Sequence, residues 1–431
     1  MIPTATDTQA RLRDRAAGLF PGGVNSPVRA FRSVGDDPLV LASGSGARVR
    51  DADGREYLDL IGGWGPAILG HAHPAVLAAV RRAAADGFAL GTTGPLEVEL
   101  GERIRARMPS LERLRFVSSG TEAVMSAVRV ARAATGRELV VVFAGGYHGH
   151  SDGLLAASGS GVATLGIPAS AGVPASMAAT TVVLPYNDAS SVALAFSSQA
   201  GRIAAVVVEP VAANTGVIPP APGFLELLRD TTRADGAVLI FDEVITGFRL
   251  GPGGAQARFG IRPDLTTLGK IIGGGMPVGA YGGRRELMDL VAPAGPVYQA
   301  GTLSGHALAM AAGIATLDAL TPAAYLALES AGEALEDGLR GAAPDAGAAV
   351  AISRLGSLLT VFFRPLAPID AAEAADVDRE AFGRFFRAML ERGVLLPPSP
   401  FEACFLSLAH GADEIGQIVD AARDAFRAAR G

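Results

Sequence analysis

Three short runs of the chain are apolar at nearly every position and rich in β-branched residues, which is typical of strands buried on both faces. They are residues 140–143, 204–208 and 238–241. They alternate with helical stretches, such as 122–134 after a Ser/Gly loop and 223–234 after a proline-rich break. Strand, loop and helix in this order predict βαβ units and a mostly parallel central sheet flanked by helices.

The two ends of the chain have different patterns. The turn signal Asp53-Gly54 within residues 51–60 predicts an antiparallel hairpin near the N-terminus. After about residue 315 come long helices, an apolar run at 358–363 and a final amphipathic helix from about Asp413. We expect three parts: an N-terminal segment (1–65), a large domain (66–314) and an α+β C-terminal domain (315–431).

Residues 151–179 are an unusually long stretch of Gly, Ser, Ala and Pro with hardly any charge. Loops of this length without structure of their own are usually lids or disordered linkers. No internal repeat and no heptad pattern is found.

The composition narrows the class of protein. Of 431 residues, 49% are apolar and 19% charged, which is ordinary globular usage with room for a large core. The net charge of -6 comes from acids and bases mixed along the chain, so nucleic acid is a poor candidate partner. Cys404 stands alone, which excludes an intrachain disulfide, and a small buried hydrophobic side chain is its simplest interpretation. No apolar run approaches about 20 residues, so we expect a soluble cytoplasmic protein without membrane contact.

Lys270 is the first candidate for chemistry, because it lies in the apolar, glycine-flanked run 267–277 with no acid nearby in the sequence. Desolvation favours the neutral amine that is needed to attack an aldehyde. The alternative is a surface lysine beside a turn. A phosphate-binding Walker A loop is excluded, because its glycine and serine or threonine spacing is missing around Lys270.

Asp242 ends the run 238–241, at the carboxyl end of a buried parallel strand, where α/β proteins bind ligands. An acid there could keep the ring nitrogen of pyridoxal phosphate protonated, so that the ring accepts electrons. The alternatives are a helix cap or an acid pair of Asp242 with Glu243 in a nucleotide-hydrolysing site.

Two further motifs follow strands. Ser118 to Ala123 opens a helix with small residues, which suits a phosphate group but is also an ordinary cap. Tyr147 lies among glycines and could lie flat against a cofactor ring. The pattern His148-x-His150 invites a metal site, but no cysteine or acid with ligand spacing accompanies it, so no metal is expected.

Together these motifs resemble the glutamate-1-semialdehyde aminomutases, relatives of the class III aminotransferases, and the resemblance runs from Phe20 to the last helix. The resembling stretches are 20–29 (FPGGVNSPVR), 64–73, 119–123 (SGTEA), 147–150 (YHGH), 241–244 (FDEV), 270–277 and 297–305. The cofactor motifs mark the superfamily, whereas the N-terminal stretch is far more specific.

The resemblance implies a type I pyridoxal-phosphate aminotransferase fold and a homodimer. Lys270 would bond to the cofactor aldehyde and move protons, Asp242 would pair with the ring nitrogen, and Tyr147 would stack on the ring. The cofactor contacts implied are Ser119, Gly120, Thr121, Tyr147, His148, Glu209, Asn214, Asp242, Lys270 and, from the neighbouring subunit, Thr302. The substrate contacts implied are Ser26, Arg29, Trp64, Ser160, Tyr298 and Glu402, with 151–179 as a gating loop.

Glu402 separates two activities within the resemblance. Ordinary class III aminotransferases tend to carry an arginine near this position for an α-carboxylate, whereas the aminomutases carry glutamate, which repels it. A solvated loop glutamate is the alternative interpretation. The chain departs from the family pattern at Ser118, Ala212-Ala213 and His306-Ala307, none of which removes a reacting group.

The expected reaction converts (S)-4-amino-5-oxopentanoate to 5-aminolevulinate for tetrapyrrole synthesis, starting from the pyridoxamine form and passing through enzyme-bound 4,5-diaminovalerate. A transient contact with the enzyme that supplies the semialdehyde is also conceivable. One rival is a class III ω-aminotransferase that uses an external amino acceptor. The other is a catalytically silent vitamin B6 binding protein, which the presence of Lys270, Asp242 and Tyr147 disfavours.

Overall fold

The computed structural model describes residues 7–155 and 170–430. Its central sheet has seven strands in the order β4-β10-β9-β8-β7-β5-β6. Their bounds are β4 Arg113–Val117, β5 Leu139–Phe143, β6 Thr181–Leu184, β7 Ile203–Val208, β8 Val238–Asp242, β9 Leu265–Gly269 and β10 Gly279–Gly283. The five strands from β9 to β6 pair in parallel, and β10 is antiparallel to both β9 and β4. The predicted strands and the mostly parallel sheet are confirmed.

Alternate residues of the central strands face two different helical layers, which explains why these strands are apolar throughout. On β5, Val140 and Val142 pack in one core with α4 (Gly120–Thr135). Val141 and Phe143 pack on the other face with α7 (Ala189–Ser198) and α8 (Phe224–Asp235). Burial of both faces is the usual requirement of a parallel sheet.

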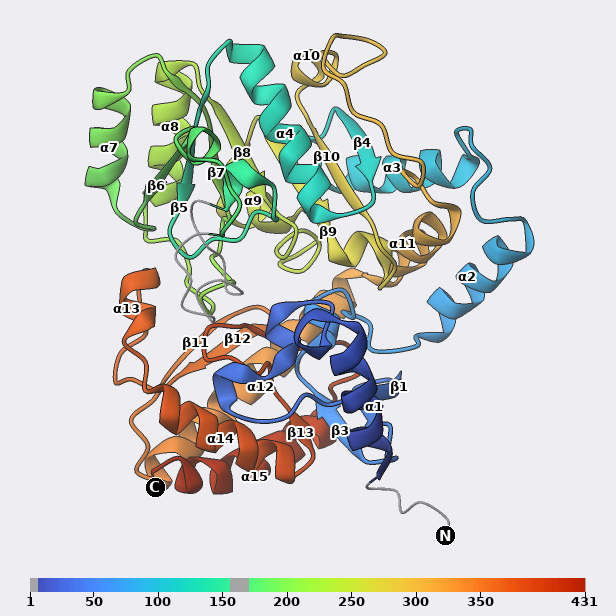
Figure 1. The fold of residues 1–431 in the computed structure, drawn as a ribbon, viewed down its shortest axis with the longest axis vertical. Coiled ribbons are helices and arrows are strands. Elements are labelled where there is room, and N and C mark those ends of the chain that lie inside the picture. Colours follow the sequence, from blue (N-terminus) through green and yellow to red (C-terminus); the bar gives the residue numbers. More distant parts are fainter. Residues whose placement is uncertain (1–6, 156–169, 431) are drawn as a thin grey trace.

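The helices of the large domain lie around this sheet in Figure 1. Besides α4, α7 and α8 they are α2 Pro74–Ala85, α3 Pro95–Arg107, α6 Ala175–Ala178, α9 Gly254–Phe259, α10 Arg285–Met288 and α11 Ala307–Ala319. Short 3₁₀ helices include η4 (Gly62–Trp64), η5 (Asp152–Leu154) and η6 (Lys270–Gly273).

The N- and C-terminal parts lie side by side below the central sheet in Figure 1. The predicted hairpin is confirmed, because β2 (Arg48–Asp51) and β3 (Glu56–Asp59) pair antiparallel. Other elements are α1 Asp7–Leu19, η1 Pro21–Gly23, η2 Pro27–Ala30, η3 Arg32–Val34, β1 Leu41–Ser45, α12 Pro322–Asp345, β11 Ala351–Leu355, β12 Leu358–Phe362, α13 Ala371–Ala375, α14 Arg379–Glu391, β13 Val394–Leu395, β14 Cys404–Phe405 and α15 Ala412–Ala429. The apolar run at 358–363 is strand β12, and the final helix begins one residue before the predicted position.

These two parts share one sheet and one core. Strand β13 pairs in parallel with β3, so the N-terminal hairpin is extended by a strand from the far end of the chain. Leu58 lies in the same apolar cluster as Phe386 and Phe426. The division at 1–65, 66–314 and 315–431 stays a proposal.

Cys404 is partly buried and packs against the apolar cluster of the terminal parts. Among the described residues no single helix is long and apolar enough to cross a membrane. Two consecutive helical segments, Ala307–Ala319 and Pro322–Pro344, are long and apolar enough for a membrane span only when they are taken as one, and the chain bends by 79° between them.

Candidate active site

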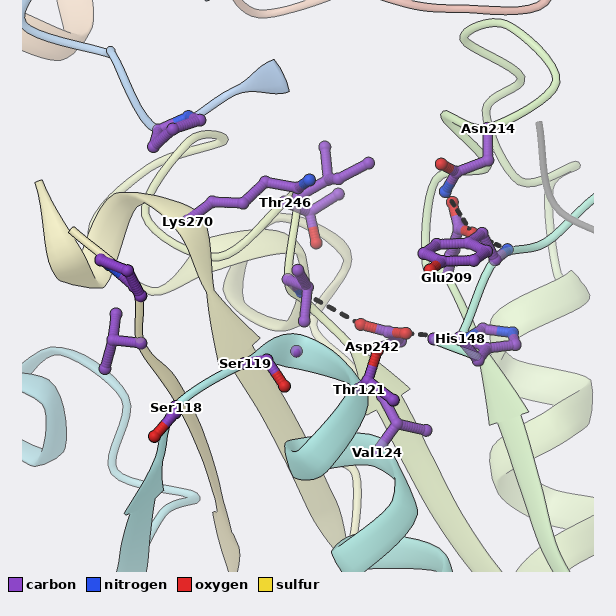
Figure 2. Close-up of a pocket in the computed structure, with 18 of the residues that line it drawn as sticks. Ser118, Ser119, Thr121, Val124, His148, Glu209, Asn214, Asp242, Thr246 and Lys270 are labelled. Carbon is purple, nitrogen blue, oxygen red and sulfur yellow. Dashed lines mark hydrogen bonds and ion pairs between the residues drawn. The ribbon is translucent and has the colours of Figure 1, made fainter. Parts of the chain in front are cut away.

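The parallel strands deliver the candidate residues to one edge of the central sheet. Tyr147 and His148 follow β5, Glu209 follows β7 at once, Asp242 is the last residue of β8, and Lys270 follows β9 at once. All the carboxyl ends of parallel strands meet at the same edge, so these side chains converge. They line a cavity of about 490 Å³ (Figure 2).

Most of the predicted site residues line this cavity. They are Arg29, Ser119, Gly120, Thr121, Tyr147, His148, Glu209, Asn214, Asp242 and Lys270. The cavity therefore combines one amine, two acids and the start of α4.

Lys270 reaches across this cavity from the first position of η6 (Figure 2). It is the only lysine of the chain, among 37 basic residues, which is a stronger sequence signal than the glycines around it. Its backbone has a positive φ of 48°, a conformation that costs free energy in a residue other than glycine and is concentrated at functional sites. Burial lowers the pKa of Lys270 and outweighs the opposite effect of Glu402, Asp242 and Glu209, which favours the neutral amine.

Asp242 is buried and held from two sides. Its Oδ2 lies 2.7 Å from Nδ1 of His148, and its Oδ1 accepts hydrogen bonds from the backbone N–H of Val244 and the hydroxyl of Thr267, both at 3.1 Å. Burial disfavours the charged form of His148, but the hydrogen bond and charge of Asp242, together with Glu209, raise the pKa of His148. The raised pKa favours a protonated His148, and its hydrogen bond fixes the Asp242 carboxylate at the place where a cationic ring nitrogen would need an acid.

Glu209 organises the loops beside the cavity. Its Oε1 accepts hydrogen bonds from the backbone N–H of Tyr147 and from Nδ2 of Asn214, both at 2.7 Å. Its Oε2 accepts one from the backbone N–H of Ala213 at 3.0 Å. Burial raises the pKa of Glu209. Ala213 and Asn214 lie within five residues of Glu209, but Tyr147 is 62 positions away and meets Glu209 only in the folded chain.

The start of α4 is built as an anion site. Ser119 caps the helix by accepting from the backbone N–H of Glu122 at 3.2 Å, and Glu122 Oε2 accepts from the backbone N–H of Ser118 at 2.7 Å. The N–H groups of Gly120 and Thr121 have no acceptor within the helix, because they belong to its first turn. These groups and the helix dipole favour a phosphate.

A scan of this chain against family models matches the aminotransferase class III family over residues 31–408. The chain belongs to the class III aminotransferases. One similar protein is the glutamate-1-semialdehyde 2,1-aminomutase of Sorangium cellulosum. It is 58% identical to this chain in an alignment that covers 97% of this chain and 95% of the relative.

Solved structures agree on the fold. An ω-transaminase from Sphaerobacter thermophilus superposes with a TM-score of 0.90 at 37% identity, covering 98% of both chains. A glutamate-1-semialdehyde aminomutase from Pseudomonas aeruginosa PAO1 gives 0.85 at 30% identity, covering 98% of this chain and 95% of the other. The type I pyridoxal-phosphate fold of this class III aminotransferase is confirmed.

The cavity of this class III aminotransferase has what pyridoxal phosphate requires. The start of α4 suits the phosphate, Asp242 suits the ring nitrogen, and Lys270 supplies the amine. Nε2 of His148 is buried without a hydrogen-bond partner among the described residues, which leaves it able to contact a bound group. No cluster of three metal-ligating side chains occurs in the described part of the chain.

Five further predicted site residues that the structure describes do not line this cavity: Ser26, Trp64, Tyr298, Thr302 and Glu402. Ser26 and Trp64 lie in the N-terminal turns, while Tyr298 and Thr302 are exposed. Their predicted contacts, one of which needs a neighbouring subunit, stay predictions. Ser160 lies outside the described residues.

Of the predicted gating loop 151–179, the structure describes the ends, with η5 and α6. Residues 156–169 lie outside the described part, so the gating role stays a prediction.

Glu402 is buried, with 8% of its surface exposed, so it is not a solvated loop residue. Among the carboxylates whose charges act on Lys270, Glu402 has the largest effect. It lines a separate, mostly apolar cavity with Leu60, Thr360 and Cys404 rather than the cavity of Lys270, so its contact with the substrate stays a prediction.

Proposed function

We propose that the chain converts (S)-4-amino-5-oxopentanoate to 5-aminolevulinate, the reaction of a glutamate-1-semialdehyde 2,1-aminomutase. The observation that carries this proposal is the 58% identity over 97% of the chain with the aminomutase of Sorangium cellulosum. The amino group moves from carbon 4 to carbon 5 by way of enzyme-bound 4,5-diaminovalerate, so no second substrate is consumed.

The residues of the cavity divide this work. Bound pyridoxal phosphate supplies an electron sink, which makes protons on the carbon next to nitrogen removable. Lys270 takes and returns those protons as its neutral amine, and Asp242 holds the ring nitrogen protonated. Arg29, which lines the cavity, suits the single carboxylate of the substrate.

The deciding experiment gives purified protein the semialdehyde without any added amino donor and measures 5-aminolevulinate. Sustained formation of the product supports the aminomutase. Turnover that requires an external amine would instead identify an ω-aminotransferase, and intact cofactor absorbance without any turnover would identify a silent binding protein.

Glu402 is expected to reject substrates with a second carboxylate, because a buried negative charge whose effect reaches the Lys270 amine also repels an α-carboxylate that approaches it. In the variant Glu402→Gln, glutamate should react with the aldehyde form of the cofactor roughly tenfold faster in a single half-reaction followed by absorbance. The exposed acid Glu226 of α8 provides a matched control in Glu226→Gln. Unchanged kinetics with both glutamate and semialdehyde would remove Glu402 from the specificity of the site.

A second copy of the chain is the proposed partner. A cavity of about 690 Å³ on the surface is lined by residues 86–97 and 301–307, which include Thr302. Phe88, Leu90 and Leu303 are 58%, 67% and 51% exposed around it, which is unusual for large apolar side chains gathered on a monomer. A homodimer would cover them and would bring Thr302 toward the neighbouring cofactor.

The dimer is tested by sedimentation. We expect a mass of about twice 43.8 kDa for the wild-type protein, and a shift toward the monomer for Leu90→Asp. A monomeric wild-type protein with full activity would contradict the proposal. We also propose a cytoplasmic location and a transient contact with the enzyme that supplies the semialdehyde.

A further inference from the structure

Arg249 is a buried cation that ties three distant segments together behind the active site. Its side chain lies in the turn after β8 with 2% of the residue exposed. One terminal nitrogen donates to the carbonyl oxygen of Gly65 at 2.5 Å, and the other to the carbonyl oxygen of Leu406 at 3.1 Å and the hydroxyl of Ser357 at 2.9 Å. The guanidinium also lies over the ring of Phe405, 5.2 Å from its centroid.

No carboxylate pairs with this charge within 4 Å among the described residues. Its Nε is buried and has no hydrogen-bond partner in the same part of the chain. Burial lowers the pKa of Arg249 to about 9, which still leaves a cation at neutral pH. Burying a charge that no carboxylate neutralises costs free energy of folding. A buried arginine of this kind therefore suggests a functional role.

The segments held by Arg249 form the wall behind Lys270. Gly65 has a φ of 113°, and a Cβ at this position would lie 3.2 Å from Cδ of Lys270 and 3.0 Å from the ring of Phe405. Gly65 and Phe405 therefore lie against each other and against the aliphatic stem of the lysine. Phe248, the residue before Arg249, is fully buried and has a φ of 60°. This conformation costs free energy in a residue other than glycine, so the surrounding packing must hold the turn of Arg249 in place.

The charges around Lys270 are unequal in sign. Glu402, Asp242 and Glu209 all favour its ammonium form, whereas Arg249 opposes it. Arg29, Tyr147 and His148 are the other titratable side chains that line the same cavity. The hydroxyl of Tyr325 donates to the carbonyl oxygen of Phe248, so Tyr325 adjoins the turn of Arg249.

We propose that Arg249 is a positioning residue that fixes the wall behind Lys270 and whose positive charge adds to burial in favouring the neutral Lys270 amine. A neutral amine is required whenever Lys270 is not bonded to the cofactor, because only that form can accept a proton from carbon. Burial is the largest cause of the lowered pKa of Lys270, and the charge of Arg249 acts in the same direction, against the three nearby carboxylates. The inference concerns the apoprotein and does not depend on which amino compound reacts.

The single lysine makes the test direct. Protein grown with lysine ¹³C-labelled at Cε gives one lysine resonance, whose titration reports the protonation of Lys270 without cofactor. In Arg249→Met the midpoint of this titration should move to higher pH. The capture of saturating pyridoxal phosphate by Lys270, which releases water as the amine adds to the aldehyde, should become about tenfold slower at pH 7.

Two controls separate charge from architecture. Ser357→Ala removes one hydrogen bond of Arg249 and keeps its charge, so the unfolding temperature should fall without a change in the Lys270 midpoint. Arg229→Met removes another buried arginine, which pairs with Asp264 before the amino end of β9, and should behave in the same way. A folded Arg249→Met protein with the wild-type midpoint would overturn the proposal.

If Arg249→Met does not fold, two measurements still decide. In Glu402→Gln the midpoint should move in the opposite direction, to lower pH, because a carboxylate that favours the ammonium form is lost. In the wild-type protein the titration midpoint of Lys270 must itself lie below that of an unperturbed lysine. A midpoint at the ordinary value of lysine overturns the proposal.

Discussion

The variant Lys270→Ala is expected to fold and to bind the cofactor while losing turnover by about three orders of magnitude or more, since proton transfer by a positioned base contributes about 10²–10⁴-fold. The start of α4 and the Asp242 carboxylate do not depend on the lysine, so binding should survive. No other lysine exists in the chain to replace it. Steady-state formation of 5-aminolevulinate and cofactor absorbance after gel filtration measure the two effects.

Lys270→Arg is the matched variant, because it keeps a long cationic side chain that cannot give up its proton at neutral pH. It should be as inactive as Lys270→Ala. Small primary amines added to Lys270→Ala should recover part of the rate if the missing group is a proton carrier. Near-normal turnover in either variant would reject Lys270 as the reacting residue.

The site at the edge of the central sheet could be predicted because its signals are local. A strand buried on both faces shows as an unbroken apolar run, and the residue that ends it, such as Asp242, is then placed at the ligand-binding edge by geometry alone. The cap at Ser119 likewise lies within four residues of its partner. Local patterns of this kind survive folding unchanged.

Contacts between distant segments could not be predicted. Strand β13 has two residues, too few to show a pattern, and its partner β3 lies more than 300 positions away. In the sequence Arg249 is one more polar residue that follows a strand. Its hydrogen-bond acceptors Gly65 and Leu406 come from distant segments and meet it only in the folded chain. Contacts of Thr302 with a neighbouring subunit depend on a surface that only a second chain provides.

Asp242 and Glu243 adjoin in the sequence, but the structure gives them different tasks. Asp242 faces the cavity, whereas the buried Glu243 caps α9 by accepting from the backbone N–H groups of Ala255 at 2.6 Å and Gln256 at 3.1 Å. The helix-cap interpretation is therefore correct for Glu243 and not for Asp242. This contrast allows a test in which two neighbouring acids are neutralised separately.

Asp242→Asn should lower turnover by about two orders of magnitude or more, because a neutral amide cannot hold the ring nitrogen protonated. The pKa of His148 should fall in the same variant, since the hydrogen bond and charge of Asp242 raise it. Stopped-flow absorbance of the half-reaction with semialdehyde measures the rate, and the ¹⁵N resonances of His148 follow its titration. Cofactor binding should remain, because the phosphate contacts at α4 are untouched.

Glu243→Gln is the matched control. It should lower the unfolding temperature through the weakened cap of α9, while the rate per bound cofactor stays near that of the wild type. If the opposite pattern is measured, with Glu243→Gln slow and Asp242→Asn unaffected, the acid that serves the ring is Glu243. A slow Asp242→Asn protein beside a fast Glu243→Gln protein assigns the ring nitrogen to Asp242, since both variants remove one carboxylate from the same turn and differ only in which way that carboxylate faces.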